Sequence, residues 1–187
     1  MEPTSSYLEL FVGCMYAGKT GKLVDIYRQS VFCNLKTMVI NYDGDKRYSQ
    51  TELSTHDKIM IPCIQTETLN QLYNDHKDEI EQADVILINE GQFFPDLYSW
   101  VSSIIDSSKK RIYICGLDGD FKRKKFGQIL DLIPLCDKIT KLTALCSLCK
   151  NGTPAIHSYR STHETGQMII GSDIYIPLCR KCYQSKT

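Results

Sequence analysis

The chain has 187 residues, of which 42% are hydrophobic and 24% are charged. This length suits one globular domain with a small appendage, and its core can form without disulfides. Because 22 basic residues balance 22 acidic ones, we expect no broad basic surface and no nucleic-acid partner, and an anionic ligand must be bound locally. The sequence shows neither an apolar run of about 18–20 residues nor a secretory signal, so we expect a cytoplasmic protein without a membrane partner.

Short apolar runs alternate with helical patterns along the first two thirds of the chain. Four runs rich in Ile and Val predict buried strands: 8–12, 37–40, 85–88 and 112–115. Three stretches with apolar residues at helical spacing predict helices: 23–31, 69–80 and 97–105. This order predicts an α/β fold in which helices flank both faces of a mainly parallel sheet. Ligands of such folds bind beyond the carboxyl ends of the strands, so we expect the functional residues there.

Residues 13–20 fit the pattern G-x-x-x-x-G-K-[ST], directly after the first predicted strand and before the first predicted helix. In this arrangement backbone N–H groups converge on phosphate oxygens at a helix N-terminus, which favours negative charge. The Lys19 ammonium adds a positive charge, and the Thr20 hydroxyl is placed to ligate Mg²⁺. A glycine-containing turn with a surface lysine is the alternative, but the flanking strand and helix favour phosphate binding. The residues predicted to bind the ATP phosphates are Gly13, Met15, Tyr16, Ala17, Gly18, Lys19 and Thr20.

Two further polar segments follow predicted strands. In residues 89–96, Glu90 lies where a general base could accept the proton of an attacking hydroxyl, although a salt-bridged carboxylate at a strand end is the alternative. P-loop proteins place an acidic residue near Mg²⁺ at the end of this strand, and the chain has Asn89 there. The second segment, residues 116–127, contains four consecutive basic residues, which we interpret as a solvated surface.

The nine cysteines divide into two groups. Two C-x-x-C pairs predict a closed tetrahedral zinc site that staples the base of a long loop: Cys146, Cys149, Cys179 and Cys182. A redox dithiol is the alternative, but it requires a single pair at a helix start. The other five lie among apolar neighbours and are predicted to be buried thiols: Cys14, Cys33, Cys63, Cys115 and Cys136. The dipeptide Asn151-Gly152 predicts a tight turn between the two pairs.

Taken together, residues 13–20, 89–96 and 117–127 and the two C-x-x-C pairs resemble the successive motifs of the cytosolic-type, zinc-containing (type II) thymidine kinases. The resemblance covers the chain from about residue 8 to residue 183. It implies a RecA-like P-loop nucleotide-binding domain over residues 1–142, followed by a small zinc-stapled lasso domain over residues 143–187. It also implies transfer of the ATP γ-phosphoryl group to the 5′-hydroxyl of thymidine, with deoxyuridine as the closest competing substrate.

The resemblance assigns roles to individual residues. Glu90 corresponds to the catalytic base and Arg47 approaches the transferred phosphate, while Mg²⁺ is held at Thr20 and at position 89, where the family ordinarily has Asp. The family's lasso bonds the thymine largely through main-chain groups. The implied substrate-binding residues are Met15, Gln92, Phe93, Leu117, Phe121, Met168, Ile169, Ile170, Gly171 and Tyr175. The family further implies a homotetramer and feedback inhibition by thymidine triphosphate (dTTP).

Two other classes of protein share some of these features. A P-loop ATPase with a zinc ribbon that acts on DNA would share the phosphate-binding pattern and the cysteines, but it would need a basic groove or an aromatic stacking platform. A non-catalytic nucleotide-binding protein is suggested by the amide at position 89.

Overall fold

A computed structural model of the chain describes residues 5–44, 52–54, 59–162, 166–167 and 174–186. Its centre is a six-stranded sheet in which every strand pair is parallel, in the order β5-β2-β6-β7-β1-β8. The strands are β1 (Tyr7–Gly13), β2 (Thr37–Tyr42), β5 (Ile64–Thr66), β6 (Val85–Ile88), β7 (Arg111–Gly116) and β8 (Lys138–Leu142). The four predicted strands are confirmed as β1, β2, β6 and β7. The two edge strands, β5 and β8, were not predicted.

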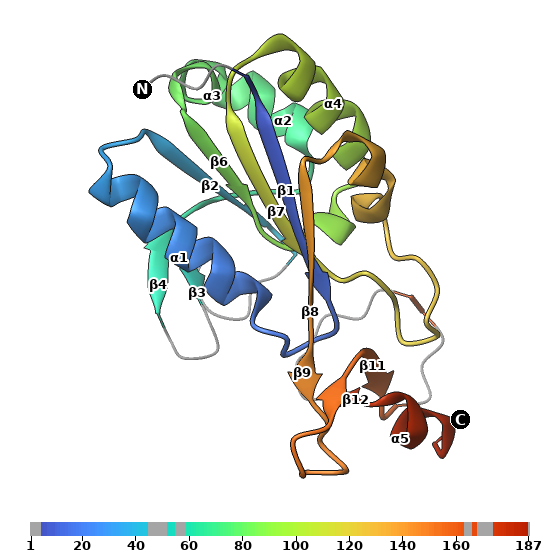
Figure 1. Cartoon of the computed structure of the whole chain (residues 1–187). Helices are drawn as coiled ribbons and strands as arrows, with labels where there is room; N and C mark the ends of the chain where they lie inside the picture. Colours follow the sequence, from blue (N-terminus) through green and yellow to red (C-terminus); the bar gives the residue numbers. More distant parts are fainter. Residues whose placement is uncertain (1–4, 45–51, 55–58, 163–165, 168–173, 187) are drawn as a thin grey trace.

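Helices cover both faces of the sheet (Figure 1). One face carries α1 (Lys19–Phe32), and the other carries α2 (Leu69–Asp75), α3 (Lys77–Gln82), α4 (Leu97–Ser107) and the 3₁₀-helix η2 (Ile129–Leu135). Strand β6 shows why its sequence is apolar throughout: Ile86 and Ile88 belong to the core under α4, whereas Val85 and Leu87 belong to the core under α1. Successive side chains point to opposite faces, so a strand covered on both faces needs an unbroken apolar run.

The helix predicted over 69–80 is divided into two. The first part, α2, begins with a cap in which the Gln71 backbone N–H donates to the Thr68 hydroxyl over 3.2 Å. It ends at His76, whose φ of −130° lies outside the helical region. The His76 ring then contacts the Glu79 carboxylate, with Nδ1 2.8 Å from Oε1, in the first turn of α3. The apolar spacing continues across this break, so periodicity alone did not reveal it.

The prediction of five buried thiols is wrong in part. Cys14 and Cys115 are buried, but Cys63 and Cys136 are only partly buried and Cys33 is exposed. Cys33 is the C-cap of α1, so it follows the last turn of the helix and is not part of the apolar face that packs on the sheet.

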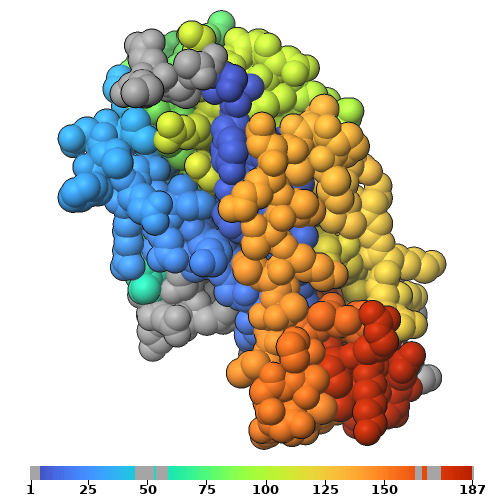
Figure 2. All heavy atoms as spheres, viewed as in Figure 1, coloured from blue at the N-terminus to red at the C-terminus, as the bar shows by residue number. Residues whose placement is uncertain are grey.

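The C-terminal segment forms a small unit beyond the carboxyl ends of the sheet strands (Figures 1 and 2). It consists of two antiparallel strand pairs and a short helix: β9 (Ala144–Leu145) with β10 (Pro154–Ala155), β11 (His157–Arg160) with β12 (Tyr175–Leu178), and α5 (Arg180–Gln184). The predicted turn at Asn151-Gly152 lies between β9 and β10, and Gly152 has a φ of +87°. A second small hairpin, β3 (Glu52–Ser54) with β4 (Met60–Pro62), lies near α1. None of the helices in the described part of the chain has the length and apolar character to span a bilayer.

Candidate functional site

The loop predicted to bind phosphate, over residues 13–20, joins β1 to α1 at the carboxyl edge of the sheet. Its backbone conformation depends on glycine: Gly13 has a φ of +155°, and a Cβ atom there would collide with the Leu142 carbonyl oxygen of β8. Gly18, with a φ of +77°, caps the N-terminus of α1, and Tyr16 also has a positive φ, 63°. A glycine-containing loop with positive φ angles at the start of a helix is the setting in which proteins bind anions through backbone N–H groups.

Two side chains of the loop carry the predicted polar chemistry. Lys19 is buried, with 8% of its surface exposed, and its Nζ donates to the Cys14 carbonyl oxygen over 2.7 Å. The ammonium is thus held against the backbone of the loop. The Thr20 hydroxyl donates to Oδ1 of Asn89, 3.3 Å away at the end of β6. The structure therefore brings together the two side chains that the sequence proposed for Mg²⁺.

Asn89 is buried and belongs to a network of neutral groups. Its Nδ2 donates to Oδ1 of Asn41 over 2.8 Å, and its Oδ1 also accepts from the Cys115 thiol over 2.9 Å. Burial raises the pKa of Cys115 to about 12, and the nearby Glu90 carboxylate adds to this effect, so the thiol stays protonated and acts as a donor. Position 89 therefore offers an oxygen atom, but no negative charge, on the side of Thr20.

Glu90 stands at the turn between β6 and the 3₁₀-helix η1 (Gly91–Phe93). Its φ of 54° lies in the left-handed region, which is uncommon for a residue with a side chain and often marks a functional position. Its Oε2 accepts from Nε2 of Gln92 over 2.7 Å. Gln92 is buried, and its Oε1 accepts from the Leu117 backbone N–H over 2.9 Å. The predicted base is thereby linked, through Gln92, to the loop that follows β7.

Aromatic rings gather at the same edge of the sheet. The rings of Tyr42 and Phe93 lie 5.2 Å apart, and those of Phe93 and Phe126 lie 5.5 Å apart in an edge-on arrangement. Phe93 was predicted as a substrate contact, but Tyr42 and Phe126 were not. Tyr42 lies two residues beyond the strand predicted over 37–40 and belongs to no motif, whereas Phe126 stands inside the 117–127 motif. Arg47 and residues 168–171 lie outside the described residues.

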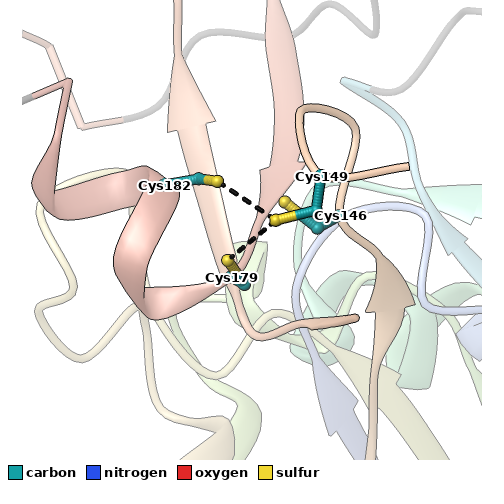
Figure 3. A group of neighbouring side chains, drawn as sticks. All are labelled: Cys146, Cys149, Cys179 and Cys182. Atoms are coloured by element: carbon teal, nitrogen blue, oxygen red, sulfur yellow. Dashed lines mark hydrogen bonds between the residues drawn. The ribbon is translucent and has the colours of Figure 1, made fainter. Parts of the chain in front are cut away.

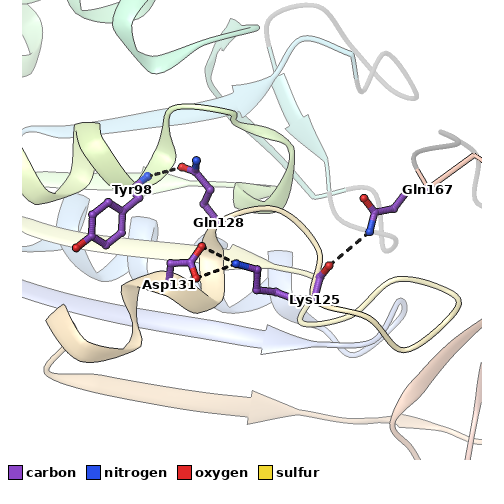
Figure 4. Close-up of polar contacts among 5 residues, drawn as sticks. All are labelled: Tyr98, Lys125, Gln128, Asp131 and Gln167. Carbon is purple, nitrogen blue, oxygen red and sulfur yellow. Dashed lines mark hydrogen bonds and ion pairs between the residues drawn. The ribbon is translucent and has the colours of Figure 1, made fainter.

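An ion pair and hydrogen bonds connect the loop over residues 117–128 to η2, α4 and the C-terminal segment (Figure 4). The Lys125 ammonium pairs with the Asp131 carboxylate in η2, with Nζ 2.8 Å from Oδ2. The Gln128 side-chain oxygen accepts from the Tyr98 backbone N–H in α4 over 2.9 Å. The Lys125 carbonyl oxygen accepts a longer bond, 3.4 Å, from the side chain of Gln167 in the C-terminal segment. As predicted, the four basic residues over 122–125 are exposed to solvent.

The four cysteine thiols of the C-terminal unit converge (Figure 3). They come from the loop after β9 and from the start of α5, and all four sulfur atoms lie within 4.8 Å of one another. The Sγ of Cys149 lies 3.3 Å from that of Cys182 and 3.7 Å from that of Cys179. Tetrahedral zinc with Zn–S bonds of about 2.3 Å places its sulfur ligands about 3.8 Å apart, so this set fits the ion.

The thiol pKa values of the cluster shift in opposite directions. Hydrogen bonding with Cys149 raises the pKa of Cys182 to about 12, and the pKa of Cys149 is raised as well, whereas that of Cys146 is lowered. Burial alone would raise the pKa of Cys146. Backbone N–H groups of Cys179, Cys149 and Leu148 donate to this thiol and lower its pKa to about 6. A thiolate is the form that binds a metal ion.

The cysteine unit also packs against the phosphate-binding loop. Cys14 shares a hydrophobic cluster with Cys146, Leu178 and Tyr183, and its thiol donates to the Ala155 carbonyl oxygen over 3.3 Å. The Met15 backbone N–H donates to the buried hydroxyl of Ser158 in β11 over 3.0 Å. The two parts of the chain thus share a small core beside the loop predicted to bind phosphate.

Comparison with known proteins decides the family. A sequence profile of the family described as thymidine kinase matches residues 6–183. The chain belongs to the thymidine kinase family. A thymidine kinase of Oryza sativa is 39% identical over 98% of this chain and 69% of its own length. One of Myxoma virus is 38% identical over 94% of this chain and 95% of its own length, and thymidine kinase 1 of Dictyostelium discoideum is 36% identical over 95% and 78%.

Membership of the thymidine kinase family confirms the resemblance drawn from the motifs. The predicted fold class is confirmed too, because a parallel sheet flanked by helices precedes a C-terminal cluster of four cysteines. The comparisons give no support to the DNA-dependent ATPase.

Proposed function

We propose that this chain is an ATP-dependent thymidine kinase that transfers the γ-phosphoryl group of ATP to the 5′-hydroxyl of thymidine. The observation that carries the proposal is that the candidate catalytic and phosphate-binding residues meet at one edge of the sheet. This edge holds the phosphate-binding loop, the Thr20–Asn89 pair and the Glu90 carboxylate, at the ends of β1 and β6. The names of its relatives support thymidine as the acceptor. We propose that deoxyuridine is also accepted.

In the proposed reaction, the N–H groups of residues 13–20 and the Lys19 ammonium bind the β- and γ-phosphates. Mg²⁺ would be held by the Thr20 hydroxyl and the Asn89 side-chain oxygen, and would neutralise charge on the phosphates. Glu90 accepts the proton of the 5′-hydroxyl while the oxygen of that hydroxyl forms a bond to the γ-phosphorus. The bond from that phosphorus to the bridging oxygen breaks and ADP leaves. Arg47 is proposed to approach the transferred phosphoryl group.

We propose that the thymine ring binds among apolar and aromatic side chains. Phe93 and Phe121 supply rings, and the other proposed contacts are Met15, Gln92, Leu117, Met168, Ile169, Ile170, Gly171 and Tyr175. The lasso over residues 143–187, held by Zn²⁺ at its four cysteines, would bond the base edge through main-chain groups, and residues 1–142 would form the kinase domain. At N3 and at the C4 substituent, cytosine has a donor where thymine has an acceptor and an acceptor where thymine has a donor. Buried main-chain groups facing these positions would stay unpaired, so deoxycytidine would be rejected.

Assembly, regulation and location are proposed by analogy with the family. We propose a homotetramer, and one apolar surface supports contact between copies: Val31 and Phe32 at the end of α1 are 51% and 86% exposed. We propose that dTTP inhibits the enzyme by competing with thymidine, and that the enzyme works in the cytoplasm.

One assay tests the activity. ATP consumption is measured with thymidine, deoxyuridine, deoxycytidine or single-stranded DNA, and without an acceptor. We expect turnover with thymidine, less with deoxyuridine, and only background with the other three. Stimulation by DNA in place of thymidine would contradict the proposal. Native mass and inhibition by dTTP at several thymidine concentrations test the assembly and the regulation.

A further inference from the structure

Arg160 is a cationic residue buried at the end of β11. Only 4% of its surface is exposed, although a guanidinium remains charged at every physiological pH. Such burial is costly unless the charge is compensated by hydrogen bonds, so the contacts of this side chain deserve a functional explanation.

The guanidinium binds three separate segments. Its Nη1 donates to the Gly166 carbonyl oxygen over 2.6 Å, and its Nη2 donates to that of Gln167 over 3.0 Å. Its Nε and Nη2 donate to the Tyr175 hydroxyl of β12 over 3.0 and 2.6 Å. Its plane lies over the Phe121 ring, with Cζ 3.7 Å from the ring centroid. Few side chains can make all these contacts, because only arginine offers five donors in a planar fork.

Each of these segments carries part of the proposed nucleoside pocket. Phe121 and Tyr175 are themselves proposed contacts of the thymidine, and residues 166–167 lead directly into the proposed contacts at 168–171. Arg160 therefore connects the loop after β7, the strand β12 and the start of the segment proposed to cover the base.

A second set of contacts joins the same segments. The Gln167 side chain donates from Nε2 to Oδ2 of Asp120 over 2.8 Å. Asp120 is buried, and its Oδ1 accepts from the backbone N–H groups of Lys122 and Lys124, each over 2.8 Å. Gln167 is thus held by its carbonyl to Arg160 and by its side chain to the loop that carries Phe121. Two independent contacts fix the relative positions of the same two segments.

We propose that Arg160 is a positioning residue for nucleoside binding: it holds Phe121, Tyr175 and residues 166–167 in the arrangement that binds thymidine. The inference rests on the proposed function of this site. Arg160 acts through other residues and stands outside the phosphate-binding loop, so its loss lowers the affinity for thymidine while ATP binding and phosphoryl transfer at saturation continue.

The test compares two substitutions at this position with a matched control. Arg160→Met keeps most of the side-chain length and removes every hydrogen-bond donor, whereas Arg160→Lys keeps the charge without the planar fork of donors. The control, Arg111→Lys, makes the same conservative change at the start of β7, at the opposite end of the sheet. For Arg160→Met we expect the KM for thymidine to rise about 10- to 100-fold, since several bonds to a charged group are lost. The KM for ATP and kcat should stay within about threefold. Arg160→Lys should fall between, and Arg111→Lys should match the wild type.

A second variant keeps the test decisive if Arg160→Met folds poorly. Tyr175→Phe removes the hydroxyl that accepts two of the guanidinium bonds, and if Arg160 acts through Tyr175, the effects of Arg160→Lys and Tyr175→Phe on the thymidine KM should be less than additive. Strict additivity would overturn the inference, because it would show that Arg160 and Tyr175 act independently. An equal rise in the KM for thymidine and the KM for ATP in every Arg160 variant would also overturn it, because it would indicate a general loosening of the structure. A wild-type enzyme that fails to phosphorylate thymidine would instead overturn the proposed function, and the inference with it.

Discussion

Glu90 is the residue on which the proposed chemistry depends. It lies at a backbone position with a φ of 54°, beside the phosphate-binding edge, and its carboxylate accepts from Gln92. Glu90→Gln keeps the size of the side chain and its ability to bond with the Gln92 amide, but an amide cannot accept the substrate proton. We expect kcat to fall by roughly 10²–10⁴ with little change in thymidine affinity. Rates of thymidine monophosphate formation, with Glu81→Gln in α3 as the control, would test this. A fall below tenfold would show that another group takes the proton.

The side chain at position 89 should determine the Mg²⁺ concentration that the enzyme requires for half its maximal rate. Asn89 contributes an oxygen without negative charge, whereas a carboxylate attracts the ion or its bound water more strongly. In Asn89→Asp the new carboxylate can accept from Thr20 and Cys115, as the amide oxygen does, and Asn41 can turn its own NH₂ group toward it. We therefore expect Asn89→Asp to reach half its maximal rate at a lower Mg²⁺ concentration than the wild type.

The measurement is a Mg²⁺ titration of the initial rate at saturating ATP and thymidine. Asn151→Asp serves as the control, because Asn151 is exposed in the β9–β10 turn and its oxygen bonds the Thr153 N–H in a way that a carboxylate reproduces. Superimposable curves for Asn89→Asp and the wild type would show that residue 89 does not serve the metal.

The backbone path of the loop over residues 117–128 depends on a glycine. Gly127 has a φ of +59°, and a Cβ atom there would collide with the Gln92 carbonyl oxygen in η1, which belongs to the backbone and cannot move aside cheaply. Gly127→Ala should therefore cost about 1–3 kcal/mol of stability. Gly21→Ala is the matched control, because Gly21 lies in α1 with open space around its Cβ position and should gain about 0.5–1 kcal/mol. Urea unfolding of both variants tests this, and equal midpoints would contradict it.

The elements that the sequence predicted correctly are those with regular burial. Strands β1, β2, β6 and β7 lie inside a sheet covered on both faces, so they read as largely apolar runs, although β1 also contains the buried Glu9. Edge strand β8 pairs on one side only and has several exposed side chains, so its sequence, Lys138–Leu142, lacks that signal.

The candidate site residues divide in the same way. The predicted phosphate-binding loop and the cysteine pairs stand out in the sequence because their chemistry needs fixed local spacing, and the proposed base Glu90 stands out because it directly follows a buried strand. Arg160 and Tyr42 were missed, since their significance depends on side chains that meet only in the folded chain: Phe121 and Tyr175 for Arg160, and Phe93 for Tyr42.

Considered as a whole, the molecule joins its four-cysteine cluster to both proposed substrate sites. Strands β11 and β12 carry Arg160 and Tyr175, and the cluster around Cys146 includes Cys14 of the phosphate-binding loop. The connections are unequal: the loop is also fixed by β1 and α1 of the main sheet, whereas β11 and β12 pair with each other and contact the rest of the chain through side chains such as Ser158 and Arg160. Loss of the metal should therefore disturb thymidine binding more than ATP binding.

This inequality leads to a prediction about zinc. Freshly purified, reduced protein should contain about one zinc ion per chain, because a closed set of four thiolates binds this ion tightly. Cys146→Ser should release the zinc, lower the temperature of unfolding, and raise the KM for thymidine more than the KM for ATP. The control is Cys33→Ser, which changes an exposed thiol at the end of α1 and should leave all three quantities unchanged. Elemental analysis, thermal unfolding and steady-state kinetics supply the measurements. Zinc-free wild-type protein that unfolds at the same temperature as a zinc-loaded sample would show that the four cysteines fold this unit without metal.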